Sequence, residues 1–192
     1  RLVIMDDIQV PDYRNPIELL HDCEAILIPE GAKITLEKGM AVFITQALGG
    51  SITVNVNGNL ARISEQNTTA LGMKPPELKQ YTSDTGNSGL IDDEIIWEQL
   101  STCYDPEIPI NIVELGLVYR CDVFYEKTGN RVEIDLTLTA PGCGMGPFLV
   151  DDIVSKVRQV PNVSLVDVDL VFDPPWSQEM MSEAARLETG LY

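Results

Sequence analysis

The second half of the chain alternates strand-like and helix-like patterns of apolar positions. Residues 132–139 alternate apolar and polar side chains, which predicts a strand with one buried face. A helical pattern follows, because Pro147 suits a first helical turn and apolar residues recur after it at helical spacing. Residues 163–172 predict another strand. Two strands joined by a helix form a parallel pair with a right-handed crossover, so we expect residues 132–172 to be a βαβ unit.

Three further elements complete this half of the chain. A helix is expected after Asp92, which can cap it, and a strand over residues 117–125 is expected to form a hairpin with the strand 132–139. A last helix is expected from Ser177 onward. The order is then α-β-β-α-β followed by a helix. We therefore predict an α+β domain with a mixed sheet and its helices on one face.

The first half of the chain predicts a small all-β domain. Its short strand patterns are separated by turn residues, and Asn57-Gly58 is a strong signal for a two-residue hairpin turn. A stretch rich in Pro, Ser and Gly, as linkers are, follows these strands. We therefore divide the chain into an N-terminal extension (1–22), the all-β domain (23–72), a linker (73–89) and the α+β domain (90–192).

Composition and charge narrow the classes of function. The chain has 30 acidic and 13 basic residues and a net charge of −17, which makes nucleic acid and anionic membranes poor partners. The excess is concentrated in residues 90–192, which hold 19 acidic and six basic residues. No apolar run approaches the roughly 20 residues of a membrane-spanning helix, and no basic-then-apolar signal segment opens the sequence. We expect no association with membranes.

The four cysteines and the single histidine limit the kinds of metal site. Cys23, Cys103, Cys121 and Cys143 include no CxxC pair, which argues against a disulfide framework and against a closed four-thiolate site. His21 is the only histidine, so centres with several histidines are excluded. We expect a reducing, cytoplasmic location, with Cys103 and Cys121 in the core.

Cys143 lies in a glycine-rich turn between the strand 132–139 and the helix that follows. A thiol at the start of a helix is near unpaired backbone N–H groups and the positive end of the helix dipole, and both favour the thiolate. Glycines on both sides allow backbone or a ligand to approach the sulfur closely. The pattern is typical of a usable thiol, and the alternative is a small, inert apolar residue.

Asp105 and Glu107 precede the strand that is expected to pair with the strand leading to Cys143. Antiparallel pairing brings the start of one strand beside the end of its partner, so both carboxylates are expected near Thr139 and Cys143. One thiolate with one or two carboxylates can hold a metal ion weakly and leave positions open for a partner's ligands. The alternative is that Asp105 and Glu107 are turn and capping residues.

Three motifs, in this order, resemble those of a known family. They are residues 105–119, which begin Asp-Pro-Glu-Ile-Pro, residues 136–146, Leu-Thr-Leu-Thr-Ala-Pro-Gly-Cys-Gly-Met-Gly, and residues 173–186, which begin Asp-Pro-Pro-Trp. Together they resemble the small α+β domain shared by SufT proteins, the phenylacetate-degradation accessory protein PaaD and a targeting component of eukaryotic cytosolic iron–sulfur assembly. Residues 44–50 and 58–63 resemble the N-terminal domain of the longer bacterial SufT proteins, which points to that branch of the family.

The resemblance implies an accessory factor for iron–sulfur cluster assembly or maturation of iron–sulfur proteins, acting in the cytoplasm with a SUF-type machinery. It implies that Cys143 and Thr139 bind a transient iron–sulfur cluster or iron, and that Cys143, Asp105 and Glu107 are the metal ligands. Where some relatives carry a second threonine, this chain has Ala140, which supplies no hydroxyl. The implied partners are iron–sulfur assembly proteins and client apoproteins, and a homodimer is one way for two chains to share the site. No catalytic residue is implied.

Two other functions stay open. The protein can be an adaptor that docks clients to the assembly machinery without using Cys143, since the acidic second half suits a basic protein surface. A thiol-based enzyme is disfavoured, because no histidine or lysine base is near Cys143 in the sequence. Asp105 and Glu107 would, moreover, raise the pKa of a neighbouring thiol.

Overall fold

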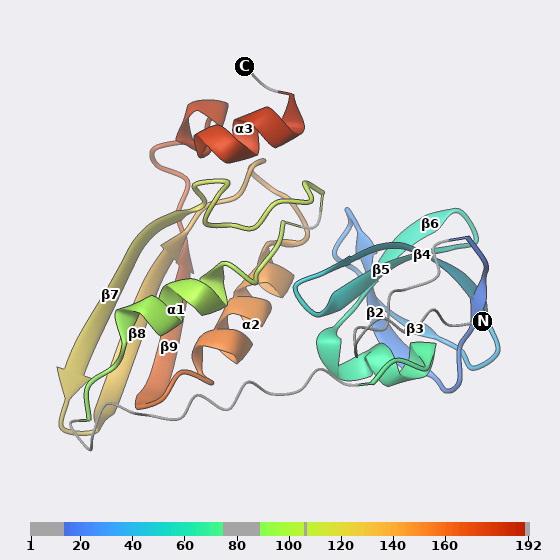
Figure 1. Ribbon diagram of the computed structural model, residues 1–192, viewed down its shortest axis with the longest axis horizontal. Helices are drawn as coiled ribbons and strands as arrows, with labels where there is room; N and C mark the ends of the chain where they lie inside the picture. Colours follow the sequence, from blue (N-terminus) through green and yellow to red (C-terminus); the bar gives the residue numbers. More distant parts are fainter. Residues whose placement is uncertain (1–13, 75–88, 106, 191–192) are drawn as a thin grey trace. The chain divides into compact units, whose positions relative to one another are not determined.

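The computed structural model describes residues 14–74, 89–105 and 107–190. The chain divides into two compact units, Arg1–Leu78 and Lys79–Tyr192. Most of the expected linker 73–89 and the start of the expected extension 1–22 lie outside the described residues. Figure 1 shows the elements of each unit, which we describe separately.

The N-terminal unit is a six-stranded antiparallel sheet, in the order β1-β4-β5-β6-β2-β3. Asn57 and Gly58 both have positive φ angles, as the predicted hairpin between β5 and β6 requires. The face that forms the core carries Val42, Val54 and Ile63, each fully buried or nearly so. The elements are β1 (Ile17–Glu18), β2 (Cys23–Ile28), β3 (Lys33–Leu36), β4 (Ala41–Leu48), β5 (Ser51–Val56), β6 (Asn59–Ile63) and the 3₁₀ helix η1 (Glu65–Leu71).

One part of the expected N-terminal extension belongs to this unit instead. Ile17 and Glu18 form β1 and pair with Val42 and Ala41 of β4. The next residue, Leu19, is only 2% exposed and lies in the hydrophobic core. A strand of two residues is too short to show an alternating pattern, so no periodic signal marks it in the sequence.

The C-terminal unit is an α+β domain with a mixed three-stranded sheet, as predicted. The strands lie in the order β7-β8-β9, with β7 antiparallel and β9 parallel to β8. Helices α1 and α2 cover one face of this sheet (Figure 1). The elements in chain order are α1 (Asp93–Leu100), β7 (Val118–Glu126), β8 (Gly129–Leu136), α2 (Gly146–Val157), β9 (Val163–Leu170), the 3₁₀ helix η2 (Gln178–Met180) and α3 (Glu183–Thr189).

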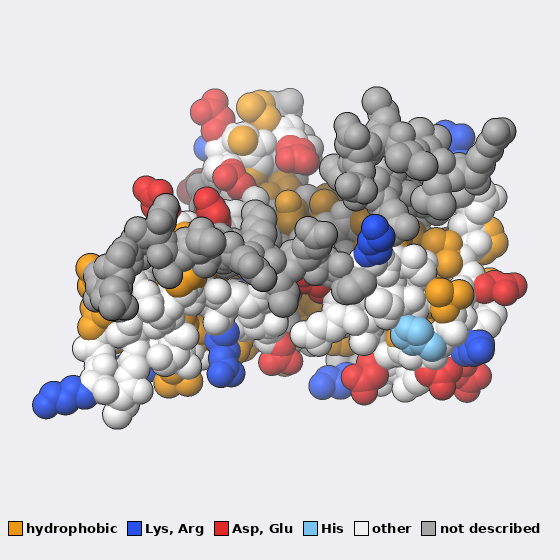
Figure 2. Space-filling model, turned by 60° about the horizontal axis from the view of Figure 1, so that its bottom comes forward, with side chains coloured by type: hydrophobic (Ala, Val, Ile, Leu, Met, Phe, Trp, Pro, Cys, Tyr) orange, Lys and Arg blue, Asp and Glu red, His pale blue; other side chains and the backbone are white. Residues whose placement is uncertain are grey.

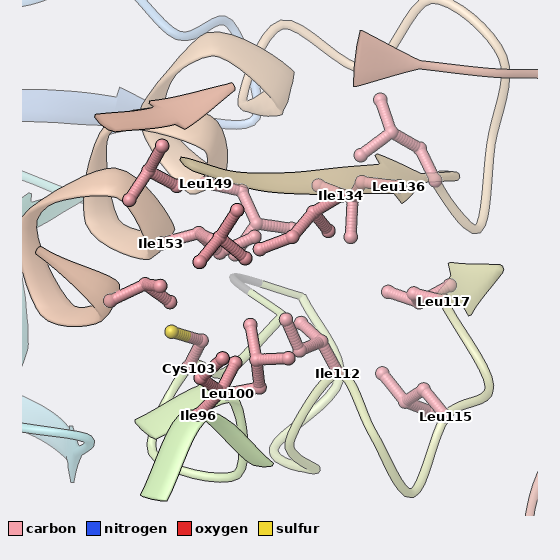
Figure 3. Packing of buried hydrophobic residues seen from close by; sticks show 14 of the residues in the cluster. Ile96, Leu100, Cys103, Ile112, Leu115, Leu117, Ile134, Leu136, Leu149 and Ile153 are labelled. Carbon is pink, nitrogen blue, oxygen red and sulfur yellow. The ribbon is translucent and has the colours of Figure 1, made fainter. Parts of the chain in front are cut away.

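The core of this unit lies between the sheet and its two helices. In Figure 3 the labelled side chains of α1 and the loop after it meet those of β8 and α2. Burying one such Leu or Ile side chain contributes about 1.5–3 kcal/mol, so this interface holds the sheet and helices together. Cys103 is fully buried there, as the sequence predicted. The labelled residues are Ile96, Leu100, Cys103, Ile112, Leu115, Leu117, Ile134, Leu136, Leu149 and Ile153.

The helix boundaries follow their caps. The side chain of Asp92 accepts a hydrogen bond from the backbone N–H of Glu94 (3.0 Å), which confirms the predicted start of α1. The last helix, α3, starts at Glu183 rather than near Ser177, because Ser182 is the residue that caps it. Between Ser177 and this cap lies the short helix η2.

The sheet face opposite α1 and α2 carries paired charges. The guanidinium of Arg120 donates to the carboxylates of Asp135 (2.8 Å), Asp122 (3.0 Å) and Glu133 (3.3 Å). This bonding to Arg120 holds the pKa of Asp135 below its usual range. On the face shown in Figure 2, the coloured Lys and Arg side chains lie apart from one another and form no basic patch. Of the helices in the described ranges, none is long and apolar enough to cross a membrane.

Candidate functional site

Cys143 sits in a tight turn between the end of β8 and the start of α2. Its backbone N–H donates to the carbonyl of Ala140 (3.3 Å), and its own carbonyl accepts from the N–H of Gly146 (3.2 Å). Its side chain is partly exposed and packs against the edge of the core. Cys143 therefore lies near the start of α2, as the sequence predicted, in a partly exposed position.

Two glycines give the turn its shape for different reasons. Gly142 has a φ of +83° with nothing near the position of a Cβ atom, so its role is conformational. A Cβ atom on Gly146 would lie 3.0 Å from Cδ1 of Leu138 and 3.3 Å from Cδ1 of Leu170. Because Gly146 has no side chain, the first turn of α2 packs directly against the ends of β8 and β9.

The four thiols have different surroundings, and all of them lie in the described part of the chain. None forms a disulfide. Cys23 and Cys103 are buried, and burial raises the pKa of Cys23. Cys121 is partly exposed, but burial, together with the negative charges of Asp93 and Asp122, raises its pKa to about 11. Cys143 is the partly exposed thiol that lies in a glycine-rich turn at a helix start.

Asp105 acts as the cap of its own turn. It is 4% exposed, and its Oδ1 atom accepts hydrogen bonds from the backbone N–H groups of Glu107 and Ile108, both at 2.9 Å. The turn closes where the N–H of Asp105 donates to the carbonyl of Ile110 (3.2 Å). This is the capping arrangement that the sequence left as an alternative to metal binding.

The structure does not bring the predicted metal ligands together as a three-residue set. Glu107 is exposed at the surface of the turn, whereas the carboxylate of Asp105 is turned inward. Across residues 14–74, 89–105 and 107–190, no three His, Cys, Asp or Glu side chains are grouped so that they could hold a metal ion. The use of Cys143, Asp105 and Glu107 as ligands stays a prediction.

Two threonines lie on the chain between β8 and the thiol. Thr139 is partly exposed, while Thr137 is 1% exposed. The Oγ1 atom of Thr137 is a buried polar atom without a hydrogen-bond partner in the described structure. The alternating pattern placed Thr137 on the polar face and so missed its burial.

The Asp-Pro-Pro-Trp motif near the C-terminus contacts the loop that precedes β7. The indole N–H of Trp176 donates to the carbonyl of Leu115 (2.8 Å), and the hydroxyl of Tyr119 donates to the carbonyl of Pro174 (2.9 Å). Gly116 has a φ of +68°, and a Cβ atom there would lie 2.2 Å from the carbonyl oxygen of Met180. We call residues 111–119 together with residues 174–182 the clasp. Its contacts give the Asp-Pro-Pro-Trp motif a structural role.

Comparisons with known proteins place the chain in a family. Residues 93–170 match the sequence family described as iron–sulfur cluster assembly protein. A protein of Porphyromonas gingivalis named "Fe-S protein maturation auxiliary factor" is 44% identical over 104 residues, which are 54% of this chain and 96% of that protein. The chain belongs to the iron–sulfur cluster assembly protein family.

Two further members of this family have similar names. "Fe-S protein maturation auxiliary factor SufT" of Staphylococcus aureus is 39% identical over 87 residues, covering 45% of this chain and 96% of the relative. "Fe-S protein maturation auxiliary factor YitW" of Bacillus subtilis is 37% identical over 98 residues, covering 51% of this chain and 93% of the relative. The family expected from the three motifs is therefore confirmed.

Proposed function

We propose that this protein is an accessory factor for the maturation of iron–sulfur proteins, and that Cys143 transiently holds iron or an iron–sulfur cluster. The names of three family members support the first part of the proposal. The position of Cys143, a partly exposed thiol in a glycine-rich turn at the start of α2, supports the second. It acts as a non-catalytic factor in the cytoplasm, with SUF-type assembly proteins and client apoproteins as its partners.

A site with one thiolate suits transfer of a cluster better than storage. Clusters that stay in a protein are held by four ligands, usually cysteine thiolates, so a single thiol leaves the other positions to a partner or to a second copy of this chain. Thr139 is close along the chain and can contribute a hydroxyl. Asp105 is buried, and its Oδ1 already accepts hydrogen bonds from the N–H groups of Glu107 and Ile108, so the carboxylates are secondary in this proposal.

Anaerobic reconstitution with iron and sulfide tests the role of Cys143. The wild-type protein is expected to gain the visible absorption of a cluster, and Cys143→Ser is expected to lose it. Cys121→Ser is the matched control, because Cys121 is also partly exposed but lies on a strand with a pKa raised to about 11. Equal absorption by wild type and Cys143→Ser would rule out Cys143 as the ligand.

Alkylation kinetics test the thiol-enzyme alternative. A nucleophilic Cys143 would react fast near neutral pH, and its rate would level off at a pH well below about 8.5, the ordinary pKa of a free cysteine. The raised pKa of Cys121 predicts the opposite for that residue. Its rate should rise about tenfold for each pH unit up to about 11, because the reactive thiolate becomes tenfold more abundant. Peptide mapping by mass spectrometry separates the two rates.

A further inference from the structure

The outer side of α1 carries an exposed tryptophan among carboxylates. Asp93, Glu94, Trp97, Glu98 and Ser101 line a shallow hollow on this side of the helix. The opposite side of α1 is buried in the core, and includes residues that are almost fully covered. We call the five residues of the hollow the Trp97 face.

The carboxylates of the Trp97 face have no cationic partner in the part of the chain that the structure describes. Within the described ranges, no ion pair involves Asp93, Glu94 or Glu98. Asp93 and Glu94 lie in the first turn, where the helix dipole favours negative charge, but Glu98 lies near the other end, where the dipole disfavours it. Glu94 and Glu98 are four residues apart, a spacing at which like charges destabilise a helix. A cation from another molecule would remove both unfavourable terms.

The opposite face of the sheet has acidic residues as well, but arginines form ion pairs with them there. There Arg120 contacts three carboxylates and Arg131 contacts three, with Glu133 shared between them. These five carboxylates share two guanidinium groups, whereas the three carboxylates of the Trp97 face form no ion pair in the described ranges. The Trp97 face therefore combines unpaired carboxylates with an exposed indole ring, which suits a basic partner.

The tryptophan narrows the chemistry of that partner. The side chain of Trp97 is 41% exposed, whereas Trp176 is partly buried and donates its indole N–H to Leu115. An indole ring is the best aromatic platform for a cation, and a guanidinium can stack on it while its N–H groups reach nearby carboxylates. An ammonium group cannot make both contacts in one plane. The combination favours arginine over lysine.

We propose that the Trp97 face docks an arginine-bearing segment of a partner protein. The arginine stacks on Trp97 and donates hydrogen bonds to Glu94 or Glu98. Docking does not use the Cys143 turn, so this proposal goes beyond the proposed function. It can be wrong while the proposed function is right. Its role is to hold a protein partner on the C-terminal unit.

A defined peptide probes this surface in the full-length protein. The probe is acetyl-Gly-Arg-Gly-Arg-Gly-amide, and the comparison peptides replace arginine by lysine or by citrulline, which is neutral and close in shape. Binding is measured by calorimetry and by two-dimensional NMR. We expect the arginine peptide to bind more tightly than the lysine peptide, and the citrulline peptide not to bind. Shifts in the NMR spectrum should be largest in α1.

Variants of the face and of the sheet separate specific docking from general attraction. Trp97→Ala is expected to weaken binding on the order of threefold. Glu94→Gln with Glu98→Gln should weaken it by a similar factor and reduce its dependence on salt. Asp122→Asn with Asp167→Asn removes the same charge from the outer sheet face and should leave binding within a factor of two. The exposed Glu→Gln changes are isosteric, so the test does not depend on whether Trp97→Ala stays folded.

Three results would overturn the proposal. One is equal weakening by the α1 and sheet variants, which would mean general electrostatic attraction. Another is equal binding of the arginine and citrulline peptides. The last is a dimer in analytical ultracentrifugation that Trp97→Ala converts to monomer, which would make the face an interface between two copies of this chain. Reconstitution at Cys143 should be the same in all these variants, which keeps this test distinct from that of the proposed function.

Discussion

The clasp and the Cys143 turn are both loops of the C-terminal unit, yet they are held in different ways. In the clasp, Trp176, Tyr119 and Ser182 all make side-chain hydrogen bonds to the other segment. In the turn, no side chain of residues 139–145 makes a hydrogen bond within the described structure, and backbone contacts alone define it. The clasp uses its polar groups internally. The turn leaves its polar groups, including the thiol, available to another molecule.

This difference distinguishes, within one domain, a motif whose polar side chains bond internally from a motif whose polar side chains do not. The Asp-Pro-Pro-Trp motif and the cysteine motif both mark the family in the sequence, but only the second presents unused chemistry. A substitution in the clasp should therefore lower stability and leave function intact in the folded fraction. A substitution in the turn should lower function with little effect on stability.

Gly116→Ala should have the largest effect on stability. The new methyl group would overlap the carbonyl oxygen of Met180, at 2.2 Å, in a residue whose φ is +68°. Relieving the overlap and the backbone strain should cost roughly 3 kcal/mol in the free energy of unfolding. Urea denaturation of the full-length protein measures this change.

Gly142→Ala is the matched control in the turn. Its φ is +83°, but nothing lies within 4 Å of the new methyl group, so only the backbone cost of about 1 kcal/mol is expected. If Gly116→Ala and Gly142→Ala lower the free energy of unfolding equally, the clasp and the turn do not differ as described.

Asp105→Ala should have the next largest effect. It leaves the backbone N–H groups of Glu107 and Ile108 without their acceptor in a partly buried turn, at a cost of about 2 kcal/mol. Asp105→Asn keeps an oxygen in the same place and should lose less. Glu107→Ala removes an exposed side chain and should change the unfolding free energy by under about 0.5 kcal/mol.

The same variants show whether Asp105 is a ligand as well as a cap. If Asp105 is only a cap, folded Asp105→Asn should gain the same cluster absorption on reconstitution as the folded wild-type protein. Loss of the cluster absorption in folded Asp105→Asn would instead show that the carboxylate of Asp105 takes part in cluster binding together with the Cys143 turn.

Thr137→Val should have a small effect, of opposite sign. The hydroxyl of Thr137 is buried without a partner, which costs free energy in the folded protein. Replacing it by a methyl group should raise the free energy of unfolding by about 1 kcal/mol or less. A loss of stability would show that the hydroxyl of Thr137 has a hydrogen-bond partner in solution. Thr137 would then resemble the clasp, whose polar side chains are hydrogen-bonded.

Much of the fold could be predicted because its signals are local. Alternation predicted the core strands, Asp92 predicted the start of α1, and Asn57-Gly58 predicted the hairpin in the N-terminal unit. The helix between β8 and β9 dictated their parallel pairing through chain connectivity. Each of these inferences needs only neighbouring residues.

What the sequence missed depends on contacts between distant residues. The sequence left open whether Asp105 caps its own turn, and the structure shows that its Oδ1 accepts hydrogen bonds from two N–H groups there. The expected approach of Asp105 to Thr139 and Cys143 stays a prediction. The burial of Thr137 was likewise not visible in an alternating pattern that placed it on the polar face. Only the structure shows that Glu94 and Glu98 form no ion pair within the described residues, because it places Arg120 and Arg131 on the other face of the sheet.

The contact of Gly146 with Leu138 and Leu170 has a consequence for encounters with other proteins. It anchors the far end of the segment 139–145, whose near end is anchored by the buried Leu138. A short segment fixed at both ends has few conformations to choose from, so we expect Cys143 to keep nearly the same position when a partner binds. Little conformational entropy would then be lost on binding, and if Cys143 holds iron as proposed, transfer of the iron would depend on the chemistry of the sulfur more than on ordering of the chain.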